Sequence, residues 1–191
     1  MKQKNTVRCI CEGAVFIAAA LALSYLKIPV MLSFGGFGGS VDLVMVPLIL
    51  FAVRRGMPWG LGAGLIFGTL KFFFAGGAAV NWQSMLLDYS LAYMAVGFAG
   101  ALRGKKCAPV LGGAIGCFGR FIVHFISGVT IYAEWMPEKF LELSMTNVWL
   151  YSLLYNGTYM LPNTVLAIVV CAVLAVPLRK YILPEGGTEE K

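Results

Sequence analysis

The sequence predicts an all-α, polytopic membrane protein, with residues 1–191 forming one integral membrane domain. Of the 191 residues 59% are hydrophobic and the mean hydropathy is +0.80, whereas soluble domains average about 45–50% apolar residues. Only 13% of the residues are charged, and they cluster between apolar stretches. Because a membrane-spanning helix needs about 20 mostly apolar residues, this length allows five or six spans joined by short loops.

Six apolar stretches are expected to be helical: Val7–Leu26, Val41–Val53, Trp59–Phe74, Trp82–Leu102, Ala108–Ile131 and Val148–Leu178. The second would reach only about 20 Å, less than the hydrocarbon layer. The glycine-rich stretch Met31–Ser40 before it is unsuited to a helix and is expected to complete the layer while packed against protein. The last stretch is too long for one straight crossing, so it either kinks at Pro162 or begins above the bilayer.

The distribution of basic residues predicts that both termini are cytoplasmic, which six spans also require. Lys and Arg are enriched in the short loops on the cytoplasmic side of membrane proteins. With cytoplasmic termini, the outer side would carry only Lys27, Lys71 and Lys139. The inner side would carry the other eleven loop and terminal cations: Lys2, Lys4, Arg8, Arg54, Arg55, Arg103, Lys105, Lys106, Arg179, Lys180 and Lys191.

Neither nucleic-acid binding nor a metal site is predicted. The net charge of +6 comes from residues at span ends, where membrane topology explains them. The five cysteines do not have zinc-site spacing: Cys9, Cys11, Cys107, Cys117 and Cys171. We therefore expect no metal and no cofactor.

Ionisable residues inside spans are costly and usually functional. Asp88 lies in the fourth stretch, while Arg120 and His124 lie four residues apart on one face of the fifth. Alternatively, an Asp88–Arg120 salt bridge holds the bundle together, or His124 is a satisfied core residue. Glu12, near the inner end of the first stretch, is interpreted as an interfacial residue.

The sixth stretch carries polar residues at helical spacing: Ser152, Asn156, Tyr159 and Asn163, flanked by Tyr151 and Tyr155. Bonding between helices and an interfacial aromatic belt would explain part of this pattern. They do not explain why a carboxylate, an imidazole and an amide would converge at one depth among aromatic rings. That combination suits a small cationic aromatic ligand, since rings attract cations and a carboxylate accepts from amino groups.

Three segments resemble the thiamine-specific substrate-binding subunit of energy-coupling-factor (ECF) transporters: Leu87–Ala92, Gly119–Gly128 with Tyr132 and Trp135–Glu138 behind it, and Tyr151–Asn156. The resemblance spans nearly the whole chain and implies a six-helix protein of the bacterial cell membrane that binds thiamine near its outer face. It implies that Asp88 bonds the pyrimidine amino side and that His124 packs on or bonds the ring system. Tyr151 would lie against the thiazolium, Asn156 would bond the pyrimidine edge, and Tyr89 and Gly128 would line the pocket.

Two residues depart from the family pattern. Asp88 replaces a glutamate and is one methylene shorter, so its reach or the ligand's pose must differ. Tyr132 stands where the family usually has a stacking tryptophan, and either Trp135 substitutes or Tyr132 stacks with less area. The outer glycine loop, with Phe34 and Phe37, looks like the family's lid.

The resemblance also implies partners, namely a transmembrane coupling protein and two ATPase subunits. The chain has no G-x-x-x-x-G-K-[ST] phosphate loop, so energy must come from elsewhere. Ala14, Ala18 and Ala22 match the row of small residues with which the family joins its partner, although internal helix packing would explain them equally well. The rival hypotheses are a subunit for another vitamin or precursor (hydroxymethylpyrimidine or riboflavin), an intramembrane enzyme using Asp88 and His124, and a membrane scaffold.

Overall fold

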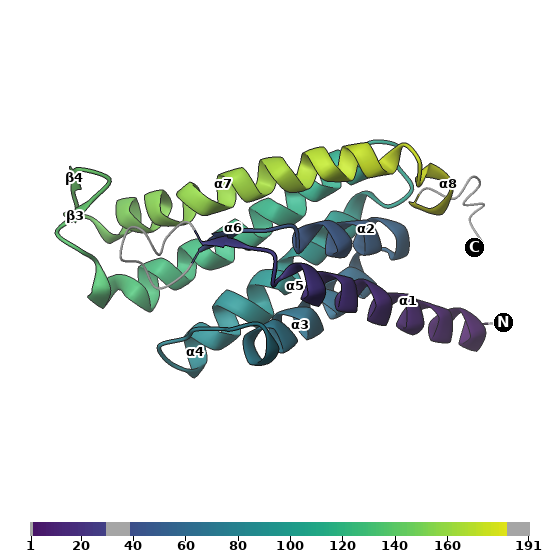
Figure 1. Cartoon of the computed structure of the whole chain (residues 1–191), viewed down its shortest axis with the longest axis horizontal. Coiled ribbons are helices and arrows are strands. Elements are labelled where there is room, and N and C mark those ends of the chain that lie inside the picture. The colour runs from purple at the N-terminus through teal and green to yellow at the C-terminus, as the bar shows by residue number, and fades with distance from the viewer. Residues whose placement is uncertain (1, 30–38, 183–191) are drawn as a thin grey trace.

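The apolar stretches form helices that run roughly along one axis of the molecule (Figure 1). The structure, a computed structural model, describes residues 2–29 and 39–182. Its elements are α1 (Lys2–Leu23), β1 (Ile28–Pro29), β2 (Ser40–Val41), α2 (Met45–Arg55), α3 (Met57–Phe74), α4 (Trp82–Met85), the π-helix η2 (Leu86–Leu91), α5 (Ala92–Val96), the 3-10 helix η3 (Gly97–Leu102), the π-helix η4 (Ala108–Gly112), α6 (Gly113–Thr130), the 3-10 helix η5 (Tyr132–Trp135), β3 (Lys139–Phe140), β4 (Leu143–Ser144), α7 (Val148–Ala175) and α8 (Arg179–Ile182).

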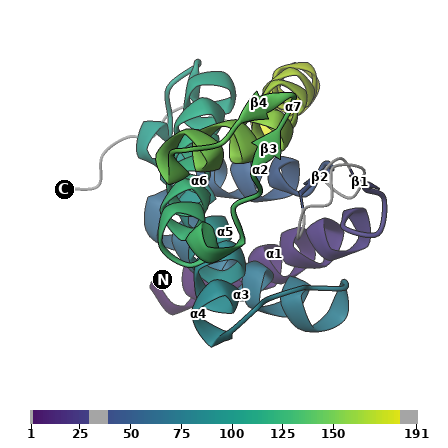
Figure 2. The same cartoon turned by 90° about the vertical axis from the view of Figure 1, so that its left-hand side faces the viewer.

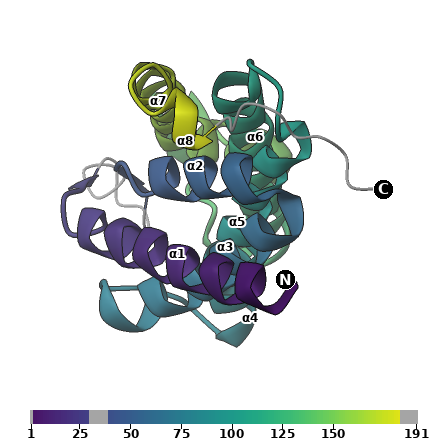
Figure 3. The same ribbon diagram turned by 90° about the vertical axis from the view of Figure 1, so that its right-hand side faces the viewer.

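Within the described residues, five helical stretches are long and apolar enough to cross a membrane: Asn5–Leu23, Met57–Phe74, Trp82–Leu102, Ala108–Thr130 and Val148–Ala175. The predicted helical membrane fold is therefore confirmed. The count of six crossings and the cytoplasmic position of both termini stay predictions. The start of α1 and helix α8 lie at the same end of the molecule (Figures 1 and 3), as that topology requires.

The short helix α2 lies inside the bundle. Every residue from Met45 to Val53 is buried, which is typical of a helix that is apolar on all sides. Helices α1, α3 and α7 pack around it together with η3. At 11 residues it is too short to cross alone, as the sequence indicated.

Several helix ends differ from the predicted ones, and three of these differences have a local reason. Helix α1 ends at Leu23, and the Ser24 hydroxyl donates back to the carbonyl of Leu21 at 2.6 Å. Helix α2 begins at Met45 instead of Val41, because residues 40 and 41 pair with β1. Helix α7 ends at Ala175, close before Pro177, which has no backbone N–H to continue the helical hydrogen bonds.

The end opposite the chain termini is built from short strands and turns, which Figure 2 shows face on. Strands β1 and β2 are antiparallel, with Ile28 opposite Val41. Strands β3 and β4 form a hairpin, with Lys139 opposite Ser144, in the connection between the fifth and sixth predicted stretches. Phe34 and Phe37, the predicted lid residues, lie outside the described residues.

Lys71, counted above with the cations of the outer side, is a buried residue near the end of a helix. Lys71 lies inside α3 with only 7% of its surface exposed, and its ammonium nitrogen is 3.2 Å from Oδ2 of Asp42. Its position close to the end of an apolar stretch resembled that of an interfacial lysine.

Glycines let α3 pack closely against the helical stretch Trp82–Leu102. A Cβ atom at Gly64 would overlap the backbone carbonyl of Tyr93, and one at Gly68 would overlap that of Tyr89. A Cβ atom at Gly60 would likewise crowd the Ala52 side chain and the carbonyl of Gly97. These three glycines stand four residues apart, the small-xxx-small spacing that allows close helix packing.

The variant Gly64→Ala should lower the free energy of unfolding by about 1–3 kcal/mol, because backbone atoms cannot move aside as a side chain can. Gly62→Ala is the matched control, since Gly62 lies on the same helix and an added Cβ there would meet no atom within 4 Å. It should be neutral or slightly stabilising, because alanine is the better helix former. Thermal unfolding in detergent measures both; equal stability would contradict the close helix contact.

Candidate ligand-binding site

A cavity of about 480 Å³ lies among α3, η2, α6 and α7, at the end of the bundle that carries the strands. This volume is within the range of about 300–1,000 Å³ typical of small-molecule sites. All eight residues predicted to contact a ligand line this cavity: Asp88, Tyr89, His124, Gly128, Tyr132, Trp135, Tyr151 and Asn156. Their convergence is a finding about geometry, and their individual roles in binding stay predictions.

Asp88 reaches the cavity from a π-helical segment, η2, which interrupts the fourth helical stretch. Such widened turns are rare and are frequent at functional sites. The Asp88 carboxylate lies 3.1 Å from Nδ1 of His124 on α6. The alternative Asp88–Arg120 salt bridge is not formed, because Arg120 instead donates from Nη2 to the Tyr93 hydroxyl at 3.0 Å.

The Asp88 contact orients the His124 ring. An ionised carboxylate accepts from Nδ1–H, which leaves Nε2 as the acceptor of the neutral ring. Nε2 is buried and has no hydrogen-bond partner in the part of the chain that the structure describes. The His124 ring therefore presents an unsatisfied polar atom at a cavity wall, where a ligand donor would satisfy it.

Aromatic side chains one helical turn apart on α7 form one wall of the cavity. The ring centroids of Tyr151 and Tyr155 are 5.7 Å apart, and those of Tyr155 and Tyr159 are 6.2 Å apart. Tyr159 meets the His124 ring edge-on at 5.9 Å. The buried Phe140 of the β3–β4 hairpin packs edge-on against Tyr151 at 5.6 Å, so the hairpin supports this wall from behind.

The Asn156 side chain is buried and makes hydrogen bonds within the protein. Its Nδ2 donates to the backbone oxygen of Ser152 at 2.9 Å, and its Oδ1 accepts from the Tyr159 hydroxyl at 2.7 Å. Because an amide oxygen has two lone pairs, Oδ1 can still accept from a ligand. Gly128 on α6 allows this arrangement, since a Cβ there would overlap the Ser152 hydroxyl.

Tyr132 and Trp135 both line the cavity, from the short helix η5 that follows α6. Their ring centroids are 6.0 Å apart, so the two predicted candidates for ring stacking stand side by side. Burial raises the pKa of the Tyr132 hydroxyl, and the nearby Asp88 carboxylate raises it further. Tyr132 therefore stays a neutral hydrogen-bonding group at physiological pH.

The cavity has a cationic side that the sequence analysis did not anticipate. Lys27, Lys71 and Arg120 line it, as do Tyr93, Tyr155 and Tyr159. Arg120 is buried with its guanidinium 4.1 Å from the centre of the Tyr93 ring, and its Nε and Nη1 have no partner among the described residues. The signals available were the spacing of Tyr155 and Tyr159 at one and two turns from Tyr151, and a lysine inside the apolar run of α3.

Two further predictions concern other parts of the molecule. Ala14, Ala18 and Ala22 are exposed on α1, so internal helix packing does not explain the row. Ala14 and Ala18 line an apolar groove bordered by α1, α2 and α3. Glu12, interpreted as interfacial, is paired with Arg54 at 3.0 Å and with Arg55 at 2.6 Å.

Comparison with known proteins gives concordant matches. Residues 10–183 match the model of a family described as thiamine transporter protein (Thia_YuaJ). The thiamine transporter ThiT of Lacticaseibacillus paracasei is 32% identical, with 98% of this chain and 96% of that protein covered. The thiamine transporter ThiT of Bacillus subtilis is 34% identical, with 89% and 91% covered.

A solved structure of ThiT from Listeria monocytogenes has the same fold, with a TM-score of 0.79 and 22% identity over 94% of this chain and all of that one. The family match covers most of the chain, and two relatives exceed 30% identity over nearly their full length. This chain therefore belongs to the thiamine transporter protein family.

Proposed function

We propose that this membrane protein binds thiamine in the cavity and takes part in its uptake as the substrate-binding subunit of an ECF-type importer. The observation that carries the proposal is the convergence of the Asp88–His124 pair and a row of tyrosine rings on one cavity. Thiamine joins an aminopyrimidine to a positively charged thiazolium, so it offers both a donor for these groups and a cation for the rings. Because the family consists of transporters, the protein is not an enzyme.

Each predicted residue has a distinct proposed role. The Asp88 carboxylate and Oδ1 of Asn156 accept from the amino side of the pyrimidine. His124 packs against the ligand and offers Nε2 as an acceptor. Tyr151 lies against the thiazolium, while Tyr132 or Trp135 covers the ligand; Tyr89 and Gly128 shape the wall. No bond of the ligand is broken in this process.

Movement of thiamine across the membrane is proposed to depend on a transmembrane coupling protein and two ATPase subunits. Support comes from the sequence, which has no phosphate-binding loop, and from the exposed row Ala14, Ala18 and Ala22 on α1. Small side chains on an exposed face let another helix approach closely. The apolar groove beside Ala14 and Ala18 is the proposed seat of the coupling protein.

Asp88→Ala and Tyr151→Ala should each weaken thiamine binding by at least tenfold, about 1.4 kcal/mol. The first removes the acceptor that orients His124, and the second removes a ring from the aromatic wall. Titration of detergent-purified protein, followed by tryptophan fluorescence, measures the affinity. Tyr181→Ala, at an exposed site on α8, is the control and should bind normally. Near-native affinity in both cavity variants would refute the assigned site, and no saturable binding to the unmodified protein would refute thiamine capture.

Gly128→Ala should reduce thiamine affinity by roughly tenfold, because the added methyl group displaces Ser152 and with it the Asn156 amide. Gly157→Ala on α7, where an added Cβ meets nothing within 4 Å, is the matched control. The same fluorescence titration compares the two variants. Equal affinities would show that Gly128 does not shape the site.

Ala18→Trp should abolish thiamine uptake while leaving thiamine affinity unchanged, because a large side chain would keep the coupling protein from the groove. Val15→Trp, an exposed position outside the groove, should retain both. Uptake of labelled thiamine by cells that express the whole transporter measures the first effect, and titration of purified protein measures the second. Normal thiamine uptake in Ala18→Trp would show that the coupling protein does not bind in this groove.

A further inference from the structure

The cavity carries more positive than negative groups in its wall. Among the residues that the structure describes, Lys27, Lys71 and Arg120 line it, and Asp88 is the one carboxylate that does. Like charges repel strongly where water is excluded. A site for a ligand with a fixed positive charge therefore needs its cations compensated by groups outside the wall.

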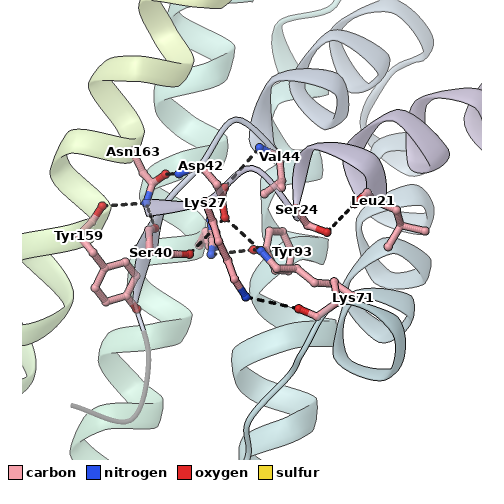
Figure 4. A network of polar contacts seen from close by, with 12 residues as sticks. Leu21, Ser24, Lys27, Ser40, Asp42, Val44, Lys71, Tyr93, Tyr159 and Asn163 are labelled. Carbon is pink, nitrogen blue, oxygen red and sulfur yellow. Dashed lines mark hydrogen bonds and ion pairs between the residues drawn. The ribbon is translucent and has the colours of Figure 1, made fainter. Parts of the chain in front are cut away.

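The Asp42 carboxylate is paired with Lys71 in a network of polar contacts (Figure 4). Its side chain is almost fully buried and does not line the cavity. Its Oδ2 lies 3.2 Å from Nζ of Lys71. A buried charge in a membrane protein is tolerated chiefly when it is paired, and this ion pair meets that condition for both groups.

The position of Asp42 is fixed by contacts that do not involve Lys71. Its backbone N–H donates to Oδ1 of Asn163 on α7 at 2.9 Å, and Nδ2 of Asn163 donates to the carbonyl of Ser40 at 2.6 Å. Its Oδ1 accepts from the backbone N–H of Val44 at 3.3 Å. The Asp42 carboxylate is therefore held in place, and its charge can be removed without removing these anchors.

Lys71 also contacts a tyrosine hydroxyl that it shares with Arg120. Nζ donates to the Tyr93 hydroxyl at 2.6 Å, and the same hydroxyl accepts from Arg120 at 3.0 Å. The hydroxyl oxygen is therefore a hydrogen-bond acceptor shared by the two cations. The Asp42 carboxylate is the group that balances Lys71 at this wall.

We propose that Asp42 is a positioning residue that acts through Lys71: it holds the ammonium group and balances its charge, so that the cavity accepts a positively charged ligand. This inference rests on the proposed function, in which the ligand is thiamine. Loss of the Asp42 charge would leave Lys71 as an uncompensated cation at the wall, and binding of a cation would suffer more than binding of a neutral molecule of the same shape.

The test compares thiamine with deazathiamine, its uncharged isostere in which the thiazolium nitrogen is replaced by carbon. Asp42→Asn keeps the shape and the acceptor for Val44 but removes the charge. It should weaken thiamine binding about tenfold or more while changing deazathiamine binding by less than about threefold. Asp42→Asn combined with Lys71→Met removes both charges and should restore the thiamine-to-deazathiamine affinity ratio to the unmodified level or above.

An equal loss for both ligands in Asp42→Asn would show a purely structural role and overturn the inference. The inference would also be overturned if the double variant kept the lowered thiamine-to-deazathiamine affinity ratio. If Asp42→Asn does not fold, the double variant tests the inference by itself. A thiamine-to-deazathiamine affinity ratio below that of the unmodified protein would then contradict charge compensation. Failure of the unmodified protein to bind thiamine would instead overturn the proposed function, and this inference with it.

Discussion

The need to pair or satisfy buried charges organises the cavity end of the bundle. Asp88 meets His124, Asp42 meets Lys71, and Arg120 stacks on Tyr93. An unpaired charge in this environment would cost several kcal/mol. Since the partners come from different segments, each pair also fixes one segment against another. The same contacts that satisfy the charges therefore set the shape of the cavity wall.

Close backbone packing sets the second condition for the site. Gly60, Gly64 and Gly68 let α3 lie directly against the stretch Trp82–Leu102. That contact brings Lys71 within reach of Tyr93, which lies on the neighbouring helix. The π-helical turn η2 then carries Asp88 and Tyr89 to the cavity. The positions of the polar groups follow from where the helices can approach without side chains between them.

The sequence predicted the helices and the residues of the α7 wall well, because both follow from local periodicity. Tyr151 and Asn156 lie on an apolar helix where polar groups stand out. It did not predict the Asp42–Lys71 pair, whose partners are 29 residues apart and sit near stretch ends, where charges are common. Nor could spacing decide whether Asp88 pairs with Arg120 or with His124, since those two lie on the same face of α6 and only the depth and direction of the side chains distinguish them.

Helix α1 connects the cavity rim with the exposed alanine row. Just beyond its end, the Tyr25 hydroxyl donates to the carbonyl of Phe74 at 2.5 Å, and β1 pairs with β2 next to Asp42. The same helix presents Ala14 and Ala18 at the apolar groove. One helix therefore lies between the apolar groove and the cavity rim, and it is joined to the rim by the Tyr25 contact and the β1–β2 strand pair. Because two-residue strand pairs and single hydrogen bonds are weak links, α1 is held to the rim less firmly than α3 is held to the stretch Trp82–Leu102, where backbones lie in direct contact.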